Sequence, residues 1–456
     1  MTLSVYYDLI LIYSIINSPI VRIIYREATK MSNIFKGKIE FYDQIRFQKG
    51  EQKTLVVNVD TRQSVFVANE ILDILFEAEK ENLSAEKLIE CAEFDDDKEY
   101  LRNVLNKLNE NHVFVDSMPP LTSKRIGISI DLTNRCNLAC RHCCVSANDD
   151  LSGELSTDEL KTIIRRVCDF DPRSISISGG EPLVRKDFQE LIIYLRERFK
   201  KPVDILTNAT LIDEDMAPFI AENFNSVSVS IDGCDEESCS IIRGEGVFEK
   251  TIAGIKRLQN AGMKDITASM TMCQENEKYR LKYVDLCKSL GIAHVFRHLC
   301  PSERNDSSDS PLHYLMPDEP MTDEKFSEYR KKYKEKGLHK IQPETFSCQG
   351  ARREFQIDFK GRLFPCPAVM EDEFYMGNML EQEDYSDFIL GGKYKESNGY
   401  KNFIAHMPFN TEGCKDCNKN LICFSCVRDL IDMKKLGTLQ YHCRDYSRIY
   451  DMYWED

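Results

Sequence analysis

The sequence has no excess of positive charge. Its 60 Lys and Arg residues stand against 75 Asp and Glu residues, which leaves a formal net charge of −15. A protein that binds nucleic acid needs a basic face for the phosphates. The charge balance therefore argues against a nucleic-acid partner and suits a soluble protein that meets basic or neutral molecules.

The chain also lacks a long apolar run. Residues 9–24 are mostly apolar, but Pro19 and Arg22 interrupt them, and the run is too short for a membrane-spanning helix. No basic segment or small-residue cleavage site indicates a signal peptide. We therefore expect a cytoplasmic protein with no membrane partner. We also expect residues 1–36 to be a leader of uncertain order, with a natural start near Met31.

Cysteine, in contrast, is abundant, with 18 residues in a chain of 456. Disulfides need an oxidising compartment, and nothing in the sequence indicates secretion. Ten cysteines form two groups at metal-ligand spacing: Cys136, Cys140 and Cys143, then Cys348, Cys366, Cys414, Cys417, Cys423, Cys426 and Cys443. Most of the other eight are interpreted as small buried hydrophobes in a reducing cytosol: Cys91, Cys144, Cys168, Cys234, Cys239, Cys273, Cys287 and Cys300.

The first group has the spacing C-x3-C-x2-C and directly follows the apolar run 126–132. Three soft thiolates suit an iron–sulfur cluster. A structural zinc site would need a fourth ligand, and Cys144 is the one candidate close by. Because a cubane has four irons, three cysteines leave one iron open to a substrate or cofactor.

Six apolar runs alternate with five helical patterns from residue 126 to residue 298. The predicted strands are 126–132, 174–178, 203–206, 226–231, 266–270 and 293–296, and the predicted helices are 157–168, 187–199, 213–222, 248–261 and 277–290. Such alternation predicts an α/β fold with parallel strands and right-handed crossovers. Six repeats predict a partial (β/α)6 TIM-type barrel over residues 124–300. Active sites of such barrels gather at the carboxyl ends of the strands, where the cysteine loop lies.

The cysteine triplet and the strand ends that follow it resemble the radical S-adenosylmethionine (SAM) enzymes, in which SAM occupies the open iron. The resemblance implies that the turn 178–182 binds the amino group of SAM, and that Ser230 and Arg243 bind its carboxylate, a role that suits a guanidinium fork. The alternative for Arg243 is a surface ion pair. The implied cofactor-binding residues are His142, Ser178, Gly179, Gly180, Glu181, Ser230 and Arg243.

The second cysteine group resembles the auxiliary-cluster domain called SPASM, which we expect over residues 346–456 after a connector at 301–345. A zinc ribbon would account for residues 414–426 alone, but not for Cys348, Cys366 and Cys443. The family arrangement implies two auxiliary 4Fe–4S clusters in addition to the SAM-binding one. One would be held by Cys414, Cys417, Cys423 and Cys443, the other by Cys348, Cys366 and Cys426. The last iron would be open or ligated from elsewhere, for example by Cys300.

Residues 37–118 are predicted to form a small separate domain. Strands are expected at 54–59, 64–67 and 112–115, and helices at 68–81, 84–92 and 97–111, with Ser84 as a cap. This order resembles the winged-helix precursor-recognition domain of enzymes that modify ribosomally made peptides. The alternative is a winged-helix DNA binder, which the acidic charge disfavours.

Together these resemblances imply a maturase that modifies a Cys-containing precursor peptide, recognised through its leader, by way of a 5′-deoxyadenosyl radical. A flavodoxin or ferredoxin is the implied reductant. The layout, with its Cys423-x2-Cys426 spacing, looks most like the maturase of subtilosin, which favours thioether formation of the sactipeptide and ranthipeptide type, with a substrate thiolate on the open iron.

Three alternatives stay open. Carbon–carbon cross-linking of a precursor peptide would use the same machinery. A sulfatase (formylglycine) maturase would have an aspartate after the second SPASM cysteine, where this chain has Pro367. A non-enzymatic electron carrier would make no 5′-deoxyadenosine.

Overall fold

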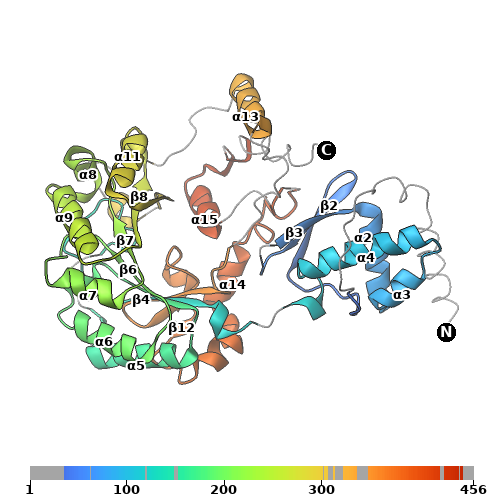
Figure 1. The fold of residues 1–456 in the computed structure, drawn as a ribbon, viewed down its shortest axis with the longest axis horizontal. Coiled ribbons are helices and arrows are strands. Elements are labelled where there is room, and N and C mark those ends of the chain that lie inside the picture. The colour runs from blue at the N-terminus through green and yellow to red at the C-terminus, as the bar shows by residue number, and fades with distance from the viewer. Residues whose placement is uncertain are drawn as a thin grey trace. The chain divides into compact units, whose positions relative to one another are not determined.

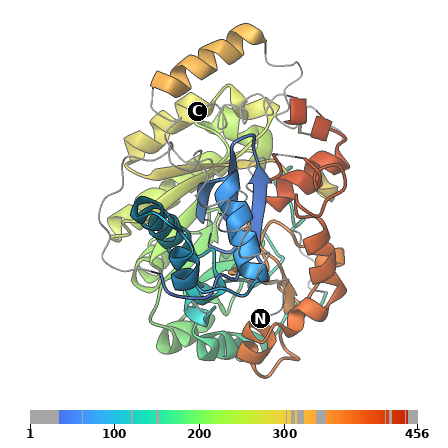
Figure 2. The same ribbon diagram turned by 90° about the vertical axis from the view of Figure 1, so that its right-hand side faces the viewer.

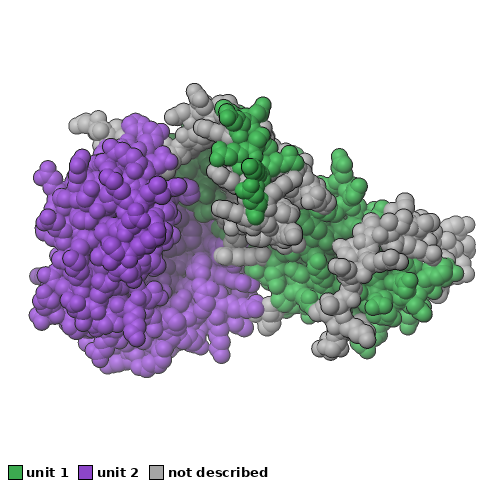
Figure 3. All heavy atoms as spheres, turned by 45° about the horizontal axis from the view of Figure 1, so that its top comes forward, with its two compact units in different colours: residues 1–120, 319–348, 406–456 green, residues 121–318, 349–405 purple. Residues whose placement is uncertain are grey.

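The structure is a computed structural model of the chain. It describes residues 35–61, 63–118, 121–147, 152–300, 302–306, 312–313, 322–335, 348–417, 419–421, 426–440 and 442–444. The chain divides into two compact units (Figure 3): unit 1 holds residues 1–120, 319–348 and 406–456, and unit 2 holds residues 121–318 and 349–405. Residues 1–34 of the expected leader lie outside the described residues.

Unit 2 is built on one open sheet in which the six predicted strands lie side by side in chain order, all parallel. They are β4 (Gly127–Asp131), β5 (Ser174–Ser178), β6 (Val203–Thr207), β7 (Ser226–Ser230), β8 (Ile266–Met272) and β9 (Ala293–His298). The connecting helices lie along the outer side of the sheet (Figure 1). They are α5 (Thr157–Phe170), α6 (Phe188–Arg198), α7 (Met216–Asn223), α9 (Val247–Asn260) and α11 (Arg280–Leu290). The prediction of an α/β core with a partial TIM-type barrel is confirmed.

Successive side chains of these strands alternate between an apolar face and a polar face of the sheet. In β5, Ile175 and Ile177 are fully buried, while the serines between them are half-buried. The register places Ser176 beside Ser129 on one side and Asp204 on the other. One face of the sheet is thus apolar, and the opposite face carries small polar side chains.

Three strands that the sequence analysis did not predict extend the sheet beyond β4. Strand β10 (Glu354–Ile357) pairs with β4 in parallel, and β11 (Arg362–Phe364) and β12 (Gly377–Asn378) follow in antiparallel order. The remaining helices of unit 2 are α8 (Glu236–Arg243), α10 (Gln274–Glu277), α12 (Glu303–Asp306) and α14 (Asn398–Ala405).

The N-terminal part of unit 1 combines an antiparallel sheet with three helices (Figures 1 and 2). The strands are β1 (Ile45–Lys49), β2 (Lys53–Asn58) and β3 (Gln63–Ala68), and the helices are α2 (Asn69–Lys80), α3 (Ala85–Glu90) and α4 (Asp95–Glu110). Ser84 caps α3 by accepting a hydrogen bond from the Lys87 amide, as predicted. Strand β1 was not predicted. The predicted strand at 112–115 is wrong, because this segment makes one isolated bridge, from Phe114 to Phe41, and then turns into a short 3-10 helix.

One face of this small sheet packs against the C-terminal part of the same unit. Leu55 and Val57 of β2 form an apolar cluster with Leu421. The Leu421 amide also donates to the side chain of Gln48, over 3.2 Å. Unit 1 further contains α13 (Asp323–Glu335) and α15 (Val427–Lys435). Among the described residues no helix has the length and apolar character needed to cross a membrane.

Candidate active site

The loop that follows β4 carries the first three cysteines. Cys140 is buried, and Cys136 and Cys143 are half-buried. Backbone amides orient two of the thiols, because Leu138 donates to Cys136 Sγ over 3.4 Å and Ala147 donates to Cys143 Sγ over 3.3 Å. The loop therefore presents three sulfur atoms from eight consecutive residues on one defined backbone path.

Burial disfavours the thiolate forms of Cys136 and Cys140. Burial raises the pKa of Cys136 to about 11, and the charges of Glu181, Cys140 and Cys143 act in the same direction. Burial also raises the pKa of Cys140, against the opposing charge of Arg243. Thiolates gathered in such a place would be stabilised by a bound metal cation, whose charge would balance theirs.

The described residues contain no group of three or more His, Cys, Asp or Glu side chains that converges on a single metal ion. A cluster makes a different demand, because each cysteine binds a different iron. The three neighbouring thiols of this loop, whose charges interact, match the ligand set of such a cluster.

Two glycines fix the start of this loop against the end of β5. The Gly180 amide donates to Thr133 O and the Glu181 amide donates to Arg135 O, both over 2.8 Å. A Cβ on Gly179 would lie within 3.0 Å of Thr133 O, and a Cβ on Gly180 equally close to Arg135 O. The φ of Gly179 is 139°, which side chains rarely adopt. Glycine is therefore required at both positions, because only a residue without a side chain lets the two backbone segments approach this closely.

Glu181 points into the protein beneath this turn and is fully buried. Its carboxylate accepts from Thr207 Oγ1 over 2.8 Å and from the Asn208 amide over 2.7 Å. Burial raises its pKa to about 7, although these hydrogen bonds oppose the shift. Asn208 in turn donates to Asn137 Oδ1 over 2.9 Å, and its Nδ2 lies 4.0 Å from Cys136 Sγ. The end of β6 is therefore tied to the cysteine loop.

Asp232, just past β7, joins two of the predicted cofactor-binding residues. Its Oδ2 lies 2.6 Å from His142 Nε2 and 2.6 Å from Arg243 Nε. Its Oδ1 accepts from the Thr271 amide over 2.6 Å. Burial alone would raise the pKa of Asp232, but the charges of Arg243 and His142 lower it to about 2. The carboxylate is therefore ionised, and it holds both side chains.

Arg243 is buried, so the alternative of a surface ion pair is wrong. It closes α8, and its Nη1 lies 3.8 Å from Cys140 Sγ. The loop is joined to α8 a second time, since Arg141 donates through its backbone amide to Ile242 O and through Nη1 to Ile241 O. Arg243 thus lies beside the cysteine loop, with its charge already paired.

Ser178 and Ser230 end β5 and β7, and both are half-buried at the carboxyl rim. They lie on the same sheet as the cysteine loop, which starts at the end of β4. Asp232 and Asn208 are the neighbouring residues that the sequence analysis did not assign. Both follow a strand end, which is the one signal in the sequence that marks them.

The described cysteines of unit 1 form two sets, and within each set the charge of one thiol raises the pKa of another. Cys414, Cys417 and Cys443 form one set, since burial and then the charge of Cys443 raise the pKa of Cys414, and Cys417 acts likewise on Cys443. Cys348 and Cys426 form the other, since burial, Asp429 and then Cys348 raise the pKa of Cys426 to about 11. Cys366 and Cys300 belong to unit 2, and Cys423 lies outside the described residues.

Comparison with protein families finds a match between residues 130–287 and the model of the radical SAM superfamily. A mycofactocin maturase, MftC, from Mycolicibacterium smegmatis is 28% identical over 58% of this chain and 69% of its own length. An AdoMet-dependent heme synthase from Methanosarcina barkeri is 33% identical over 56% of this chain and 79% of its own length.

Two solved structures are similar in fold. The structure of anSMEcpe with bound AdoMet and the Cp18Cys peptide aligns with a TM-score of 0.52 at 20% identity, covering 74% of this chain and 97% of that one. Streptococcus suis SuiB bound to S-adenosylmethionine aligns with a TM-score of 0.50 at 18% identity, covering 86% of this chain and 96% of that one. At these sequence identities, the two structures support similarity of fold alone.

Proposed function

Because this chain belongs to the radical SAM superfamily, we propose that it is a maturase that forms thioether links in a Cys-containing precursor peptide. Enzymes of this superfamily work with a 4Fe–4S cluster and SAM. Cys136, Cys140 and Cys143 would hold that cluster here and leave one iron for SAM. When bound, the cluster and SAM supply a carbon-centred radical that abstracts hydrogen from the peptide.

The protein's own residues have the task of holding this chemistry in place. The glycine turn at 179–180 seats the cysteine loop against β5. Asp232 fixes His142, which lies between two of the cysteines, and Arg243, which lies beside Cys140. A rigid arrangement of this kind raises the fraction of encounters in which a reacting group is correctly aimed.

The observation that carries the proposal is the cysteine loop after β4, where Asn208 Nδ2 lies 4.0 Å from Cys136 Sγ and Arg243 Nη1 lies 3.8 Å from Cys140 Sγ. The SPASM arrangement would give a first set of Cys414, Cys417, Cys423 and Cys443 and a second set of Cys348, Cys366 and Cys426, one for each auxiliary cluster. The charge interactions of Cys414 with Cys443 and of Cys426 with Cys348 are compatible with it. The second set then has three cysteines and an open iron, with Cys300 as an alternative ligand. An open iron suits a substrate thiolate, because thiolate is the ligand that iron–sulfur clusters favour.

The peptide substrate rests on the relatives and on the N-terminal domain. MftC is named as a maturase, and SuiB has been crystallised with its precursor peptide SuiA. Residues 37–118 would recognise the leader of the precursor. A flavodoxin or ferredoxin would supply the electrons. Calorimetry tests the leader assignment: the full chain should bind leader peptide, and a chain without residues 1–118 should not.

The decisive experiment is anaerobic turnover of reconstituted enzyme with SAM, reductant and the Cys-containing short peptide encoded nearest the gene. Thioether formation predicts loss of two hydrogens per event together with loss of one alkylatable thiol in the mass spectrum. Loss of two hydrogens with every thiol free would instead establish carbon–carbon cross-linking. Conversion of a cysteine to an aldehyde would establish formylglycine formation, which the absence of a carboxylate at Pro367 disfavours.

A further inference from the structure

A buried arginine, Arg185, forms hydrogen bonds with the backbone at the start of the cysteine loop. It closes the short 3-10 helix after the glycine turn, and its side chain is 6% exposed. Its Nη1 donates to Leu132 O over 2.9 Å and to Leu155 O over 3.1 Å. Nε and Nη2 form a fork on Asp187, at 2.9 and 2.7 Å. This planar geometry is one that Lys cannot reproduce.

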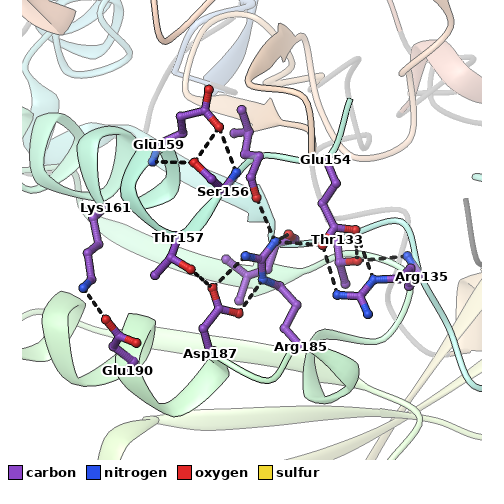
Figure 4. Close-up of polar contacts among 12 residues, drawn as sticks. Thr133, Arg135, Glu154, Ser156, Thr157, Glu159, Lys161, Arg185, Asp187 and Glu190 are labelled. Atoms are coloured by element: carbon purple, nitrogen blue, oxygen red, sulfur yellow. Dashed lines mark hydrogen bonds and ion pairs between the residues drawn. The ribbon is translucent and has the colours of Figure 1, made fainter. Parts of the chain in front are cut away.

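Glu154 extends this hydrogen-bond network from Leu132 into the cysteine loop (Figure 4). One buried carboxylate accepts from Arg185 Nη1 over 3.0 Å, from Thr133 Oγ1 over 2.8 Å and from Arg135 Nε and Nη2 over 3.2 and 3.1 Å. The Thr133 hydroxyl also accepts from the Arg135 amide over 3.0 Å. Two of the three residues between Leu132 and Cys136 are thus held by Glu154.

The glycine turn also holds the same short stretch, through main-chain hydrogen bonds. Thr133 O and Arg135 O accept from the amides of Gly180 and Glu181. The backbone from Leu132 to Arg135 is therefore fixed both by side chains and by main-chain hydrogen bonds, immediately before Cys136. The contacts of Arg185 and Glu154 reach the thiols only through this stretch.

The network is balanced in charge, with two arginines against Glu154 and Asp187. Burial would raise the pKa of Asp187, but its bonds to Arg185 and Thr157 lower it to about 2. A buried ionic network of this kind adds little stability over an apolar cluster of the same volume. A polar network in which every hydrogen bond is formed instead favours one conformation over the alternatives. Because this network lies at the base of the cysteine loop, it fixes the conformation of the backbone that leads to Cys136.

We propose that Arg185 and Glu154 are positioning residues for SAM cleavage, which set the path of residues 132–135 and thereby the placement of Cys136. This rests on the proposed cluster at Cys136, Cys140 and Cys143. The two residues act through Thr133, Arg135 and the backbone, and not on SAM or substrate.

The test compares Glu154→Gln, Arg185→Lys and Thr133→Val with the wild type and with a control. Glu190→Gln is the control, because it breaks only the exposed pair with Lys161, on the neighbouring helices α5 and α6 (Figure 4). Hydrogen exchange is measured on the metal-free protein. On the reconstituted protein, the electron paramagnetic resonance (EPR) spectrum of the SAM-binding cluster and the rate of 5′-deoxyadenosine formation are measured.

We expect amide exchange at residues 133–136 to accelerate about tenfold or more in the three variants, with α7 and α11 unchanged. The EPR signal of the SAM-binding cluster should shift while the auxiliary signals stay, and SAM cleavage should fall about tenfold or more. The control should match the wild type in every readout. Thr133→Val keeps every ion pair, so it tests the idea even if a charge variant does not fold.

Two results would overturn the inference. One is exchange that accelerates equally throughout unit 2, which would assign the network to general stability. The other is wild-type exchange and a wild-type EPR spectrum in all three variants. A failure of the cluster assignment is distinguishable, because the wild type itself would then form no 5′-deoxyadenosine.

Discussion

His142 Nε2 and Asp232 Oδ2 lie 2.6 Å apart, although 90 residues separate them in the chain. The imidazole comes from the cysteine loop, and the carboxylate comes from the rim just past β7. Arg243 approaches the same oxygen, at 2.6 Å from its Nε. One carboxylate therefore orients both His142, which lies between Cys140 and Cys143 in the chain, and Arg243, whose Nη1 lies 3.8 Å from Cys140 Sγ.

Replacing Asp232 with Asn should impair SAM binding and cleavage. The amide cannot balance Arg243, and loss of one partner of a buried ion pair costs about 3–5 kcal/mol of folding free energy. We expect a higher KM for SAM and a rate of 5′-deoxyadenosine formation lower by about tenfold or more. Chromatography of 5′-deoxyadenosine at several SAM concentrations measures both.

A matched control is Asp169→Asn, which breaks an exposed ion pair with Arg165 on the outer helix α5. Exposed pairs contribute about 0–1 kcal/mol, so this variant should retain wild-type kinetics. If Asp232→Asn keeps the wild-type KM and rate, the carboxylate does not organise the SAM site.

The strands of the core could be predicted because their alternation is strong. The sequence Ser-Ile-Ser-Ile-Ser at 174–178 predicts β5 with the same bounds that the structure has. Strand β10 has no such signal: it is four residues long, three of them buried, and it depends on pairing with β4, more than 220 residues earlier in the chain. The order of the chain does not encode that pairing.

The residues of the candidate site also divide into those that the sequence reveals and those that it does not. The cysteines and the Gly-Gly-Glu turn are visible because their spacing is local. Asp232 and Arg185 are single charged residues whose importance comes from partners brought close by the fold, at Arg243 and Glu154. A lone charge at a strand end carries little information until its partners are known, which is why both were missed.

Gly180→Ala should remove the SAM-binding cluster while leaving unit 1 intact. The new methyl group would meet Arg135 O at less than 3.0 Å, and backbone cannot move aside without shifting the cysteine loop. We expect iron content to fall by about four atoms per chain and 5′-deoxyadenosine formation to be lost. Iron analysis and EPR spectroscopy measure the two effects.

Gly291→Ala provides the comparison for this substitution. A Cβ there meets open space, and the φ of 66° costs about 1–2 kcal/mol for a residue with a side chain. Iron content should stay at the wild-type level. Full cluster occupancy in Gly180→Ala would show that the close approach of the two backbones is not needed.

Stability should fall with rising pH because of Asp131 at the end of β4. Burial, followed by the charge of Asp358, raises the pKa of Asp131 to about 8 from its ordinary value of 3.8. Between these values the folded chain keeps a proton that the unfolded chain releases. The contribution of this group to the unfolding free energy therefore decreases as pH rises, by at most about 1.4 kcal/mol per unit.

Asp131→Asn removes this titration, so the stability of the variant relative to wild type should be greater at pH 8 than at pH 6. Urea unfolding of metal-free protein, followed by circular dichroism, gives both differences. Asp372→Asn, at an exposed carboxylate that pairs with Arg362, should show no such trend. Equal differences at the two pH values would mean that Asp131 is ionised throughout.

The two cysteine sets of unit 1 make separable predictions for the auxiliary clusters. Cys417→Ala and Cys426→Ala should each remove one cluster, with about four irons lost per chain, because the proposed arrangement assigns the two thiols to different clusters. The charge interactions of Cys417 with Cys443 and of Cys426 with Cys348 agree with that assignment. Combining Cys414→Ala with Cys417→Ala should remove no more iron than one of them, whereas combining Cys417→Ala with Cys426→Ala should remove both clusters. Cys168→Ala, on helix α5 of unit 2, is the control.

In all of these variants SAM cleavage without peptide should persist, because the cysteine loop after β4 is untouched. Cys140→Ala should give the reverse pattern, with both auxiliary clusters present and no 5′-deoxyadenosine. Iron analysis, Mössbauer spectroscopy and chromatography distinguish the cases. If Cys417→Ala and Cys426→Ala together lose no more iron than either alone, the seven cysteines serve one centre, and the proposal of two auxiliary clusters is wrong.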